Sequence, residues 1–215
     1  MTKREEQIKE ILQKNDLLCA PTEKITSDAS NRKYQRLTKG NKTVILMDSN
    51  PDENEPVNNF IYFTKFLRKH NFSAPKIYDS DIPNGLLLLE DLGARNFADI
   101  LKVTPKVETN IYKEAVNQLI MIQSKGTPKQ AKPYSTEILV EEALLFTEWY
   151  LGEVNSSRLS KQFTSLLTPL LKKIDQTKPT LVLRDFHAEN LISVSYTHLR
   201  AHETRGNLVC RLLLE

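Results

Sequence analysis

The hydrophobic pattern of this 215-residue chain changes once, close to Gly93, from the spacing of strands to the spacing of helices. Before that point, short apolar runs are separated by turn residues such as those of the segment Asp81-Ile82-Pro83-Asn84-Gly85. After it, apolar residues recur at helical spacing through three segments, and no strand pattern returns until residue 181. This order predicts an α+β fold with a strand-rich part in residues 1–90 and a helical part in residues 91–193.

The strand-rich part is predicted to be a small sheet with helices packed on it. In the first helix Ile8, Ile11 and Leu12 share one face, as expected for a helix that buttresses a sheet. A tight turn at Lys39-Gly40-Asn41 is expected to join two of the strands as a hairpin. The predicted elements are helices over residues 4–18 and 56–71 and strands over residues 24–37, 43–47, 76–78 and 86–89.

The helical part is predicted from three apolar stripes with a period near that of the α-helix. We interpret the leucine-rich third stripe as core, and we interpret Trp149 on the second helix as core rather than as a platform for a sugar ring. A short connection near Asp91-Leu92-Gly93 joins the two parts. The stripes are formed by Ile111, Ala115, Leu119 and Ile122, by Leu139, Ala143, Phe146 and Tyr150, and by Leu159, Phe163, Leu166, Leu167, Leu170, Leu171 and Ile174.

Composition is that of a soluble globular protein, with 40% hydrophobic and 27% charged residues and a net charge of only +3. Lys and Arg are scattered, so we expect neither a nucleic acid nor a membrane as partner. The charged N-terminus lacks the apolar segment of a secretory signal, which makes the cytoplasm the expected location. Cys19 and Cys210 are far apart and lack zinc-ligand spacing, so neither a disulfide nor a zinc site is expected.

The strongest chemical signal is the segment Arg184-Asp185-Phe186-His187-Ala188-Glu189-Asn190, which is flanked by apolar residues 179–183 and 191–192. The flanks predict a polar loop between two buried strands. Asp185 and Asn190 are five positions apart, the spacing in the catalytic loop of protein kinases, where the Asp accepts the proton of the attacking hydroxyl and the Asn holds magnesium. His187 falls where that loop has a Lys, so we expect it to help hold the transferring phosphate. The alternative is an ordinary polar turn.

Together with three further segments, this loop resembles the aminoglycoside-phosphotransferase-like kinases, and among them the bacterial kinases that phosphorylate cell-wall amino sugars at the anomeric hydroxyl. The segments are Ser27-Asp28-Ala29-Ser30-Asn31-Arg32-Lys33-Tyr34-Gln35-Arg36-Leu37, Val44-Ile45-Leu46-Met47-Asp48 and Leu86-Leu87-Leu88-Leu89-Glu90-Asp91-Leu92-Gly93. The resemblance implies a protein-kinase-like fold of two lobes, and it implies ATP and Mg²⁺ as cofactors.

The resemblance also implies roles for residues outside the catalytic loop. Asp28, Ala29 and Ser30 would form the loop over the ATP phosphates, where small residues let main-chain N–H groups approach. Arg32, Lys33 and Arg36 would supply positive charge there, or else be solvent-facing charges on a strand. The remaining implied residues form the hinge, whose main chain would meet adenine; they are Glu90, Asp91 and Leu92.

The resemblance implies transfer of the γ-phosphoryl group of ATP to a hydroxyl of a small molecule, with an amino sugar of cell-wall recycling as the leading acceptor. Choline, homoserine or an aminoglycoside is the alternative within enzymes. A different class, a nucleotide-binding pseudokinase, is suggested because Leu46-Met47-Asp48 stands where the third strand of a kinase carries a phosphate-binding Lys. The acceptor and the oligomeric state are left open by the sequence.

The last segment, residues 194–215, resembles one reading frame of a transposase-end sequencing adapter. We therefore expect it to be foreign to the protein, so that His198, His202 and Cys210 are no metal cluster. Kinases of this plan have a second metal ligand, an Asp, on the strand after the catalytic loop. On this interpretation the helical lobe is incomplete, and the 215-residue chain is expected to be inactive.

Overall fold

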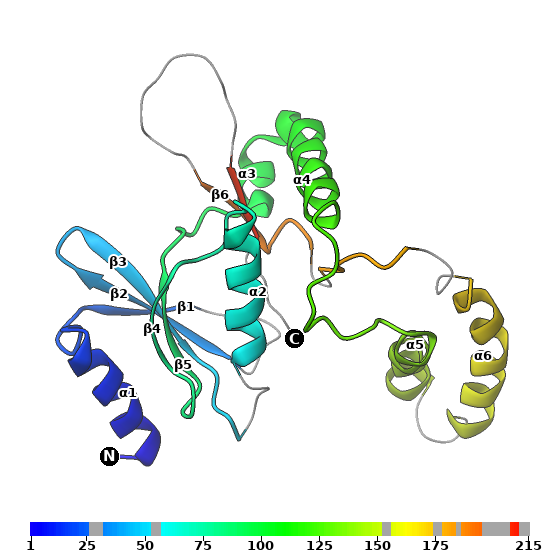
Figure 1. Ribbon diagram of the computed structural model, residues 1–215, viewed down its shortest axis with the longest axis horizontal. Helices are drawn as coiled ribbons and strands as arrows, with labels where there is room; N and C mark the ends of the chain where they lie inside the picture. The colour runs from blue at the N-terminus through cyan, green and yellow to red at the C-terminus, as the bar shows by residue number, and fades with distance from the viewer. Residues whose placement is uncertain are drawn as a thin grey trace. The chain divides into compact units, whose positions relative to one another are not determined.

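The chain divides into two compact units, one of Met1–Lys125 with Val182–Glu215 and the other of Gly126–Leu181, so the second is an insertion within the first. The computed structural model describes residues 1–25, 32–52, 57–151, 156–173, 178–183, 186–194 and 207–210 (Figure 1). The lobe boundary expected near residue 91 falls inside the first unit, and the division into lobes stays a prediction.

The first unit is built on a five-stranded antiparallel sheet with the strand order β1-β2-β3-β5-β4. The predicted hairpin is confirmed: Lys39 pairs with Lys42, and the chain turns at Gly40-Asn41 between β2 and β3. The strands are β1 (Thr22–Ile25), β2 (Lys33–Lys39), β3 (Lys42–Asp48), β4 (Ile77–Asp81) and β5 (Leu86–Glu90).

The single strand predicted over residues 24–37 is wrong, because this stretch contains β1 and the start of β2. Ile25 pairs with Tyr34 in an antiparallel ladder, so the two segments run in opposite directions. The residues between them, 26–31, are all polar or small, and none has the long apolar side chain that a buried strand would carry. Ser27 and Asp28 are residue types that favour turns, and the prediction of one continuous strand did not take them into account.

Each face of the sheet is covered by one helix, which explains why all four leucines of β5 from Leu86 to Leu89 are buried. Helix α1 (Lys3–Lys14) packs Ile11 and Leu12 against alternate strand residues, including Leu37 and Leu46. Helix α2 (Asn58–Lys69) packs Phe60 on the residues that alternate with them, including Tyr34 and Met47. Figure 1 shows α1 and α2 on opposite sides of the strands. Both predicted helices are confirmed.

After the sheet, the first unit continues through α3 (Phe97–Val103), a 3₁₀ turn η1 (Pro105–Val107) and α4 (Glu108–Gln123), and it later receives β6 (Leu191–Val194) and β7 (Asn207–Cys210). β6 and β7 pair as an antiparallel two-stranded sheet. The predicted helix over α4 is confirmed, and it buries Ala115 and Ile122.

The strand predicted before the catalytic loop is not formed. Residues 178–183 have no strand assignment, although Leu181 and Leu183 are buried as the prediction required. A strand needs a partner for its main-chain groups as well as a buried side-chain pattern, and no ladder to these residues exists among those described. The predicted strand after the loop is confirmed as β6.

The second unit contains α5 (Thr136–Leu151) and α6 (Ser156–Leu171), which pack against each other. The contact includes a hydrogen bond of 2.9 Å between the hydroxyl oxygens of Thr147 and Ser160 and a ring pair of Phe146 and Phe163 with centroids 6.3 Å apart.

Much of the apolar surface of α5 and α6 is exposed, contrary to the predicted cores of both stripes. Leu166 and Leu170 are 69% and 59% exposed, Phe146 and Tyr150 are also exposed, and Trp149 is 86% exposed. Helical periodicity identifies the apolar side of a helix, but it does not identify what covers that side. Two helices bury only the side chains between them.

Candidate functional site

The hinge segment begins where β5 ends, at Glu90. The main-chain N–H of Glu90 donates to the carbonyl of Lys76 at 2.8 Å, and the carboxylate of Glu90 accepts from the N–H of Lys76 at 2.9 Å. Arg68 lies 3.7 Å from the same carboxylate. Glu90 is therefore fixed to the residue that precedes β4, and its side chain is committed to holding the strand ends together.

The next residue, Asp91, is the most strongly bound carboxylate of the segment, and its side chain is only 5% exposed. Arg36 of β2 donates to both of its oxygens, from Nε at 2.7 Å and from Nη2 at 3.3 Å. The main-chain N–H of Gly93 donates to Asp91 Oδ1 at 2.9 Å, and the side chain of Thr43 adds a further hydrogen bond. Arg36 also pairs with Glu23, directly opposite on β1, at 3.2 Å.

These contacts set the ionisation of the pair. Burial alone would raise the pKa of Asp91, but the hydrogen bonds from Arg36, Thr43 and Gly93, with the charge of Arg36, hold that pKa below its ordinary value. The hydrogen bond to Asp91 raises the pKa of Arg36 against the opposing effect of its burial. Two residues predicted for the nucleotide site, Arg36 and Asp91, are thus brought together, and Arg36 is engaged by carboxylates.

We expect the Asp91 contacts to make the protein less stable in acid. Because the pKa of Asp91 is lower in the folded protein, its contribution is complete above about pH 4 and is lost as the pH falls through the folded value. Urea unfolding between pH 5 and pH 3 should show a shallower loss of stability for Asp91→Asn than for the unchanged chain. Asp79, whose pKa is lowered by hydrogen bonds from Asn15 and Lys14, acts in the same direction, so Asp79→Asn should also reduce the slope. Equal slopes for all three chains would contradict this prediction.

Leu92 completes the predicted hinge and is half-buried. Its main-chain N–H and C=O form no hydrogen bond within the part of the chain that the structure describes. A main-chain donor and acceptor of this kind are what the edge of a nucleobase requires.

The end of the predicted catalytic loop docks on the residues that follow the hinge. The N–H of Ala98 donates to the carbonyl of Ala188 at 3.2 Å, and the N–H of Ser193 donates to the carbonyl of Arg95 at 3.1 Å. Asn96 and Ile192 also form an isolated antiparallel bridge. The loop and the hinge, far apart in sequence, are therefore joined through a few residues at the start of α3.

Sequence reasoning missed α3 and its role in placing the loop. The helix is seven residues long and lacks a long apolar stripe, so periodicity gives a weak signal. The available signal was Asn96, whose side chain accepts from the N–H of Asp99 at 2.8 Å and caps the helix.

Within the loop, His187 and Asn190 form a local pair. Nδ2 of Asn190 lies 3.0 Å from Nε2 of His187, and the N–H of Asn190 donates to the carbonyl of His187 at 2.9 Å. Asn190 is buried, whereas His187 is exposed. The carboxamide of Asn190 also carries Oδ1, an oxygen of the type that binds magnesium.

Several predicted site residues lie outside the described part of the chain, namely Asp28, Ala29 and Ser30 of the phosphate loop and Arg184 and Asp185 of the catalytic loop. Arg32 is described and is buried, at 5% exposed, with an interacting partner. Among the described residues, no three His, Cys, Asp or Glu side chains are grouped as they would be around a metal ion.

The end of β3, near which kinases place a phosphate-binding Lys, carries a partly buried ion pair instead. Arg4 of α1 binds the carboxylate of Asp48 through Nε, at 3.1 Å, and through Nη2, and it donates from Nη1 to the carbonyl of Asn84 at 2.6 Å. This arrangement ties the first helix to the sheet.

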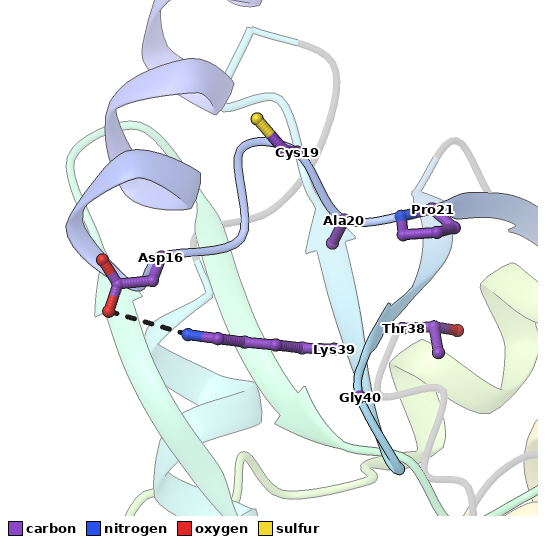
Figure 2. Close-up of a pocket in the computed structure, with 7 residues that line it drawn as sticks. All are labelled: Asp16, Cys19, Ala20, Pro21, Thr38, Lys39 and Gly40. Atoms are coloured by element: carbon purple, nitrogen blue, oxygen red, sulfur yellow. Dashed lines mark ion pairs between the residues drawn. The ribbon is translucent and has the colours of Figure 1, made fainter.

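Two open hollows are found on the α1 side of the sheet, with volumes of about 310 and 400 Å³. The smaller is shown in Figure 2, where Lys39 extends across it toward Asp16 and the exposed thiol of Cys19 lies at its rim. The larger lies between α1 and β4. Neither is lined by a residue of the predicted site. No helix in the described ranges combines the length and the apolar character needed to cross a bilayer.

Comparison with known protein families shows which family the chain belongs to. The profile of the phosphotransferase enzyme family APH matches residues 22–200, which include the sheet, the hinge and the whole predicted catalytic loop. The chain belongs to the APH phosphotransferase family.

Curated relatives of this APH chain include two proteins named N-acetylmuramate/N-acetylglucosamine kinase. The one from Pseudomonas aeruginosa is 28% identical over 172 residues, which cover 78% of this chain and 50% of the relative. The one from Pseudomonas putida is 27% identical over 199 residues, with 87% and 57% covered. The chain thus spans about half the length of the curated relatives it matches.

Solved structures confirm the α+β, kinase-like fold of the APH chain. Choline kinase LicA from Streptococcus pneumoniae superposes with a TM-score of 0.65 at 15% identity, covering 97% of this chain and 68% of that protein. A spectinomycin phosphotransferase in complex with ADP and spectinomycin gives a TM-score of 0.56 at 12% identity, with 96% and 70% covered. LicA is also known in complex with AMP.

Proposed function

We propose that the protein encoded by the native gene is an ATP- and Mg²⁺-dependent kinase that transfers the γ-phosphoryl group to a hydroxyl of a small molecule. The observation that carries the proposal is the loop at residues 186–194: Asn190 is buried and bonded to His187, and the loop is anchored on the segment after the hinge through Ala188 and Ser193. Membership of the APH family supports the same reaction class.

In this proposal each predicted residue acts through its own chemistry. Asp185 orients the acceptor hydroxyl and accepts its proton, and His187 helps to hold the transferring phosphate. The main chain of the hinge at Glu90, Asp91 and Leu92 binds adenine. The phosphates are covered by Asp28, Ala29 and Ser30, with Arg32 as the nearby cation.

Magnesium fits the donor chemistry of the loop, because the carboxamide of Asn190, whose nitrogen lies 3.0 Å from Nε2 of His187, has an oxygen of the type that binds magnesium. Asn190 would hold the ion, which would neutralise charge on the phosphates during transfer.

The leading acceptor is an amino sugar of cell-wall recycling in the cytoplasm, phosphorylated at the anomeric hydroxyl. The names of the two Pseudomonas relatives support this choice. Choline and aminoglycosides are the next candidates, and the names of the structural neighbours favour them.

A product screen tests the proposal. The native gene product is incubated with ATP, Mg²⁺ and, in separate reactions, N-acetylmuramate, N-acetylglucosamine, choline, homoserine and an aminoglycoside, and the products are identified by phosphorus NMR. We expect a phosphate on the anomeric oxygen of an amino sugar. Phosphorylation of another acceptor would replace the amino sugar, and no phosphorylated product in any reaction would contradict the kinase assignment.

A nucleotide-binding pseudokinase is the second candidate. It is favoured by the Asp48–Arg4 ion pair near the place where an active kinase has its strand Lys. Loss of Asp185 separates the two candidates, because a scaffold does not depend on a catalytic base.

A further inference from the structure

Arg36 is placed to act on the hinge. Its guanidinium contacts both oxygens of Asp91, and its side chain is 18% exposed. On β2, Arg36 alternates with Leu37, which faces α1, so it lies on the opposite side of the sheet, the side of Tyr34.

Asp91 connects Arg36 to the main chain of the hinge. The carboxylate oxygen Oδ1, which accepts from Arg36 Nη2, also accepts from the N–H of Gly93. The residue between them, Leu92, is the one whose main-chain groups form no hydrogen bond among the described residues. The hydrogen bond between the Asp91 side chain and the N–H of Gly93 thus bridges Leu92, and it restricts the conformations that the peptide groups on either side of Leu92 can adopt.

We propose that Arg36 is a positioning residue: through Asp91 it holds the main chain of Leu92 in the conformation that binds adenine, and it is not a ligand of the ATP phosphates. This rests on the proposed nucleotide site. It assigns Arg36 to the nucleobase end of that site, whereas the sequence placed it among the phosphate-binding cations.

The chemistry of the contact explains why an arginine serves here. A guanidinium offers two N–H groups to one carboxylate, which fixes the orientation of that carboxylate as well as its charge. An ammonium group gives charge without that fork. Removing Arg36 leaves Asp91 buried beside only weaker donors, so the hinge spends part of its time in other conformations, and apparent affinity falls with the populated fraction of the competent one.

The test separates the two ends of ATP. Affinities of the native gene product for adenosine, which has no phosphate, and for tripolyphosphate, which has no base, are measured by calorimetry. For Arg36→Met and for Asp91→Asn we expect adenosine to bind about tenfold more weakly, as for a competent hinge populated about one tenth of the time. Tripolyphosphate should bind both variants as it binds the unchanged protein, and Arg36→Lys should lie between Arg36→Met and the unchanged protein for adenosine.

Lys39→Met is the matched control. Lys39 is a cation on the same strand, but it pairs with Asp16 at 3.6 Å on the α1 side of the sheet (Figure 2). Its loss should change neither affinity. A phosphate-binding Arg36 would show the reverse pattern, with tripolyphosphate weakened in Arg36→Met and Asp91→Asn unaffected, and this would overturn the proposal, as would unchanged affinities in both variants.

Amide hydrogen exchange of Gly93 gives a readout that does not depend on the nucleotide. In the 215-residue chain we expect this N–H to exchange about tenfold faster in Arg36→Met than in the unchanged chain, with Lys39→Met unchanged. If the unchanged native protein binds neither probe, the proposed nucleotide site fails, while the exchange rate still decides whether Arg36 fixes the hinge. If Arg36→Met does not fold, Arg36→Lys carries the same comparison, and an exchange rate of Gly93 equal to that of the unchanged chain would overturn the proposal.

Discussion

Asp185→Asn in the native gene product is expected to lower the rate of phosphoryl transfer by about 10²- to 10⁴-fold, the range for loss of a general base. The carboxamide keeps the shape of the side chain but does not take the proton of the acceptor hydroxyl. Binding of ATP should stay within about twofold of the unchanged protein, because the base acts on the acceptor and not on the nucleobase. Single-turnover kinetics and nucleotide calorimetry measure the two quantities separately.

Glu189→Gln is the matched control for Asp185. Glu189 lies in the same loop and is exposed, so the same chemical change there should leave the rate unaltered. Equal rates for Asp185→Asn and the unchanged protein would favour the pseudokinase, and equal losses in both variants would show that the loop responds to charge in general.

Gly85→Ala should lower the free energy of unfolding by about 4 kcal/mol, above the usual range of roughly 0.5–3 kcal/mol for a single substitution. Gly85 has a φ of +64°, and a Cβ at this position would lie 2.0 Å from the carbonyl oxygen of Ser49 and 3.3 Å from Pro51 Cδ. The main-chain N–H of Ser49 also donates to the carbonyl of Gly85 at 2.9 Å, so the two segments are already in close contact. Main chain must move to admit the methyl group, and the end of β3 moves with it.

Gly40→Ala separates that steric effect from conformational preference. Gly40 has nearly the same φ, +60°, but a Cβ there meets no atom within 4 Å. Its substitution should therefore show only the left-handed penalty of an L-residue, about 1–2 kcal/mol. Urea unfolding of both variants measures the difference, and similar losses for the two would contradict the close approach at Gly85.

The sheet and the helices that cover it were accessible from the sequence because their signals are local. The apolar run Leu86–Leu89 indicates a strand, and the spacing of Ile11 and Leu12 indicates a helix, and both can be recognised without knowing which elements they pack against. The spacing of His187 and Asn190 is also local, and the structure brings their side chains to 3.0 Å. The packing of Leu166 and Trp149 is not local, since exposure depends on which other elements reach them.

The contacts of the hinge could not be predicted for a related reason. Arg36 and Asp91 are 55 positions apart, and their pairing requires the register that places β2, β3 and β5 side by side. From the sequence alone, an arginine near a phosphate loop is as well explained by phosphates as by a carboxylate. The strand order removes that ambiguity for the partner of Arg36, and the experiments on adenosine and tripolyphosphate address its role.

The insertion of Gly126–Leu181 between α4 and the catalytic loop has an evolutionary consequence. The anchoring hydrogen bonds, from the N–H of Ala98 to the carbonyl of Ala188 and from the N–H of Ser193 to the carbonyl of Arg95, involve only residues outside the insertion. Substitutions, or changes of length, within residues 126–181 therefore do not replace any of the residues that make those bonds. A lineage built on this plan can diversify the inserted helices under selection while inheriting one unaltered anchor for its reactive loop.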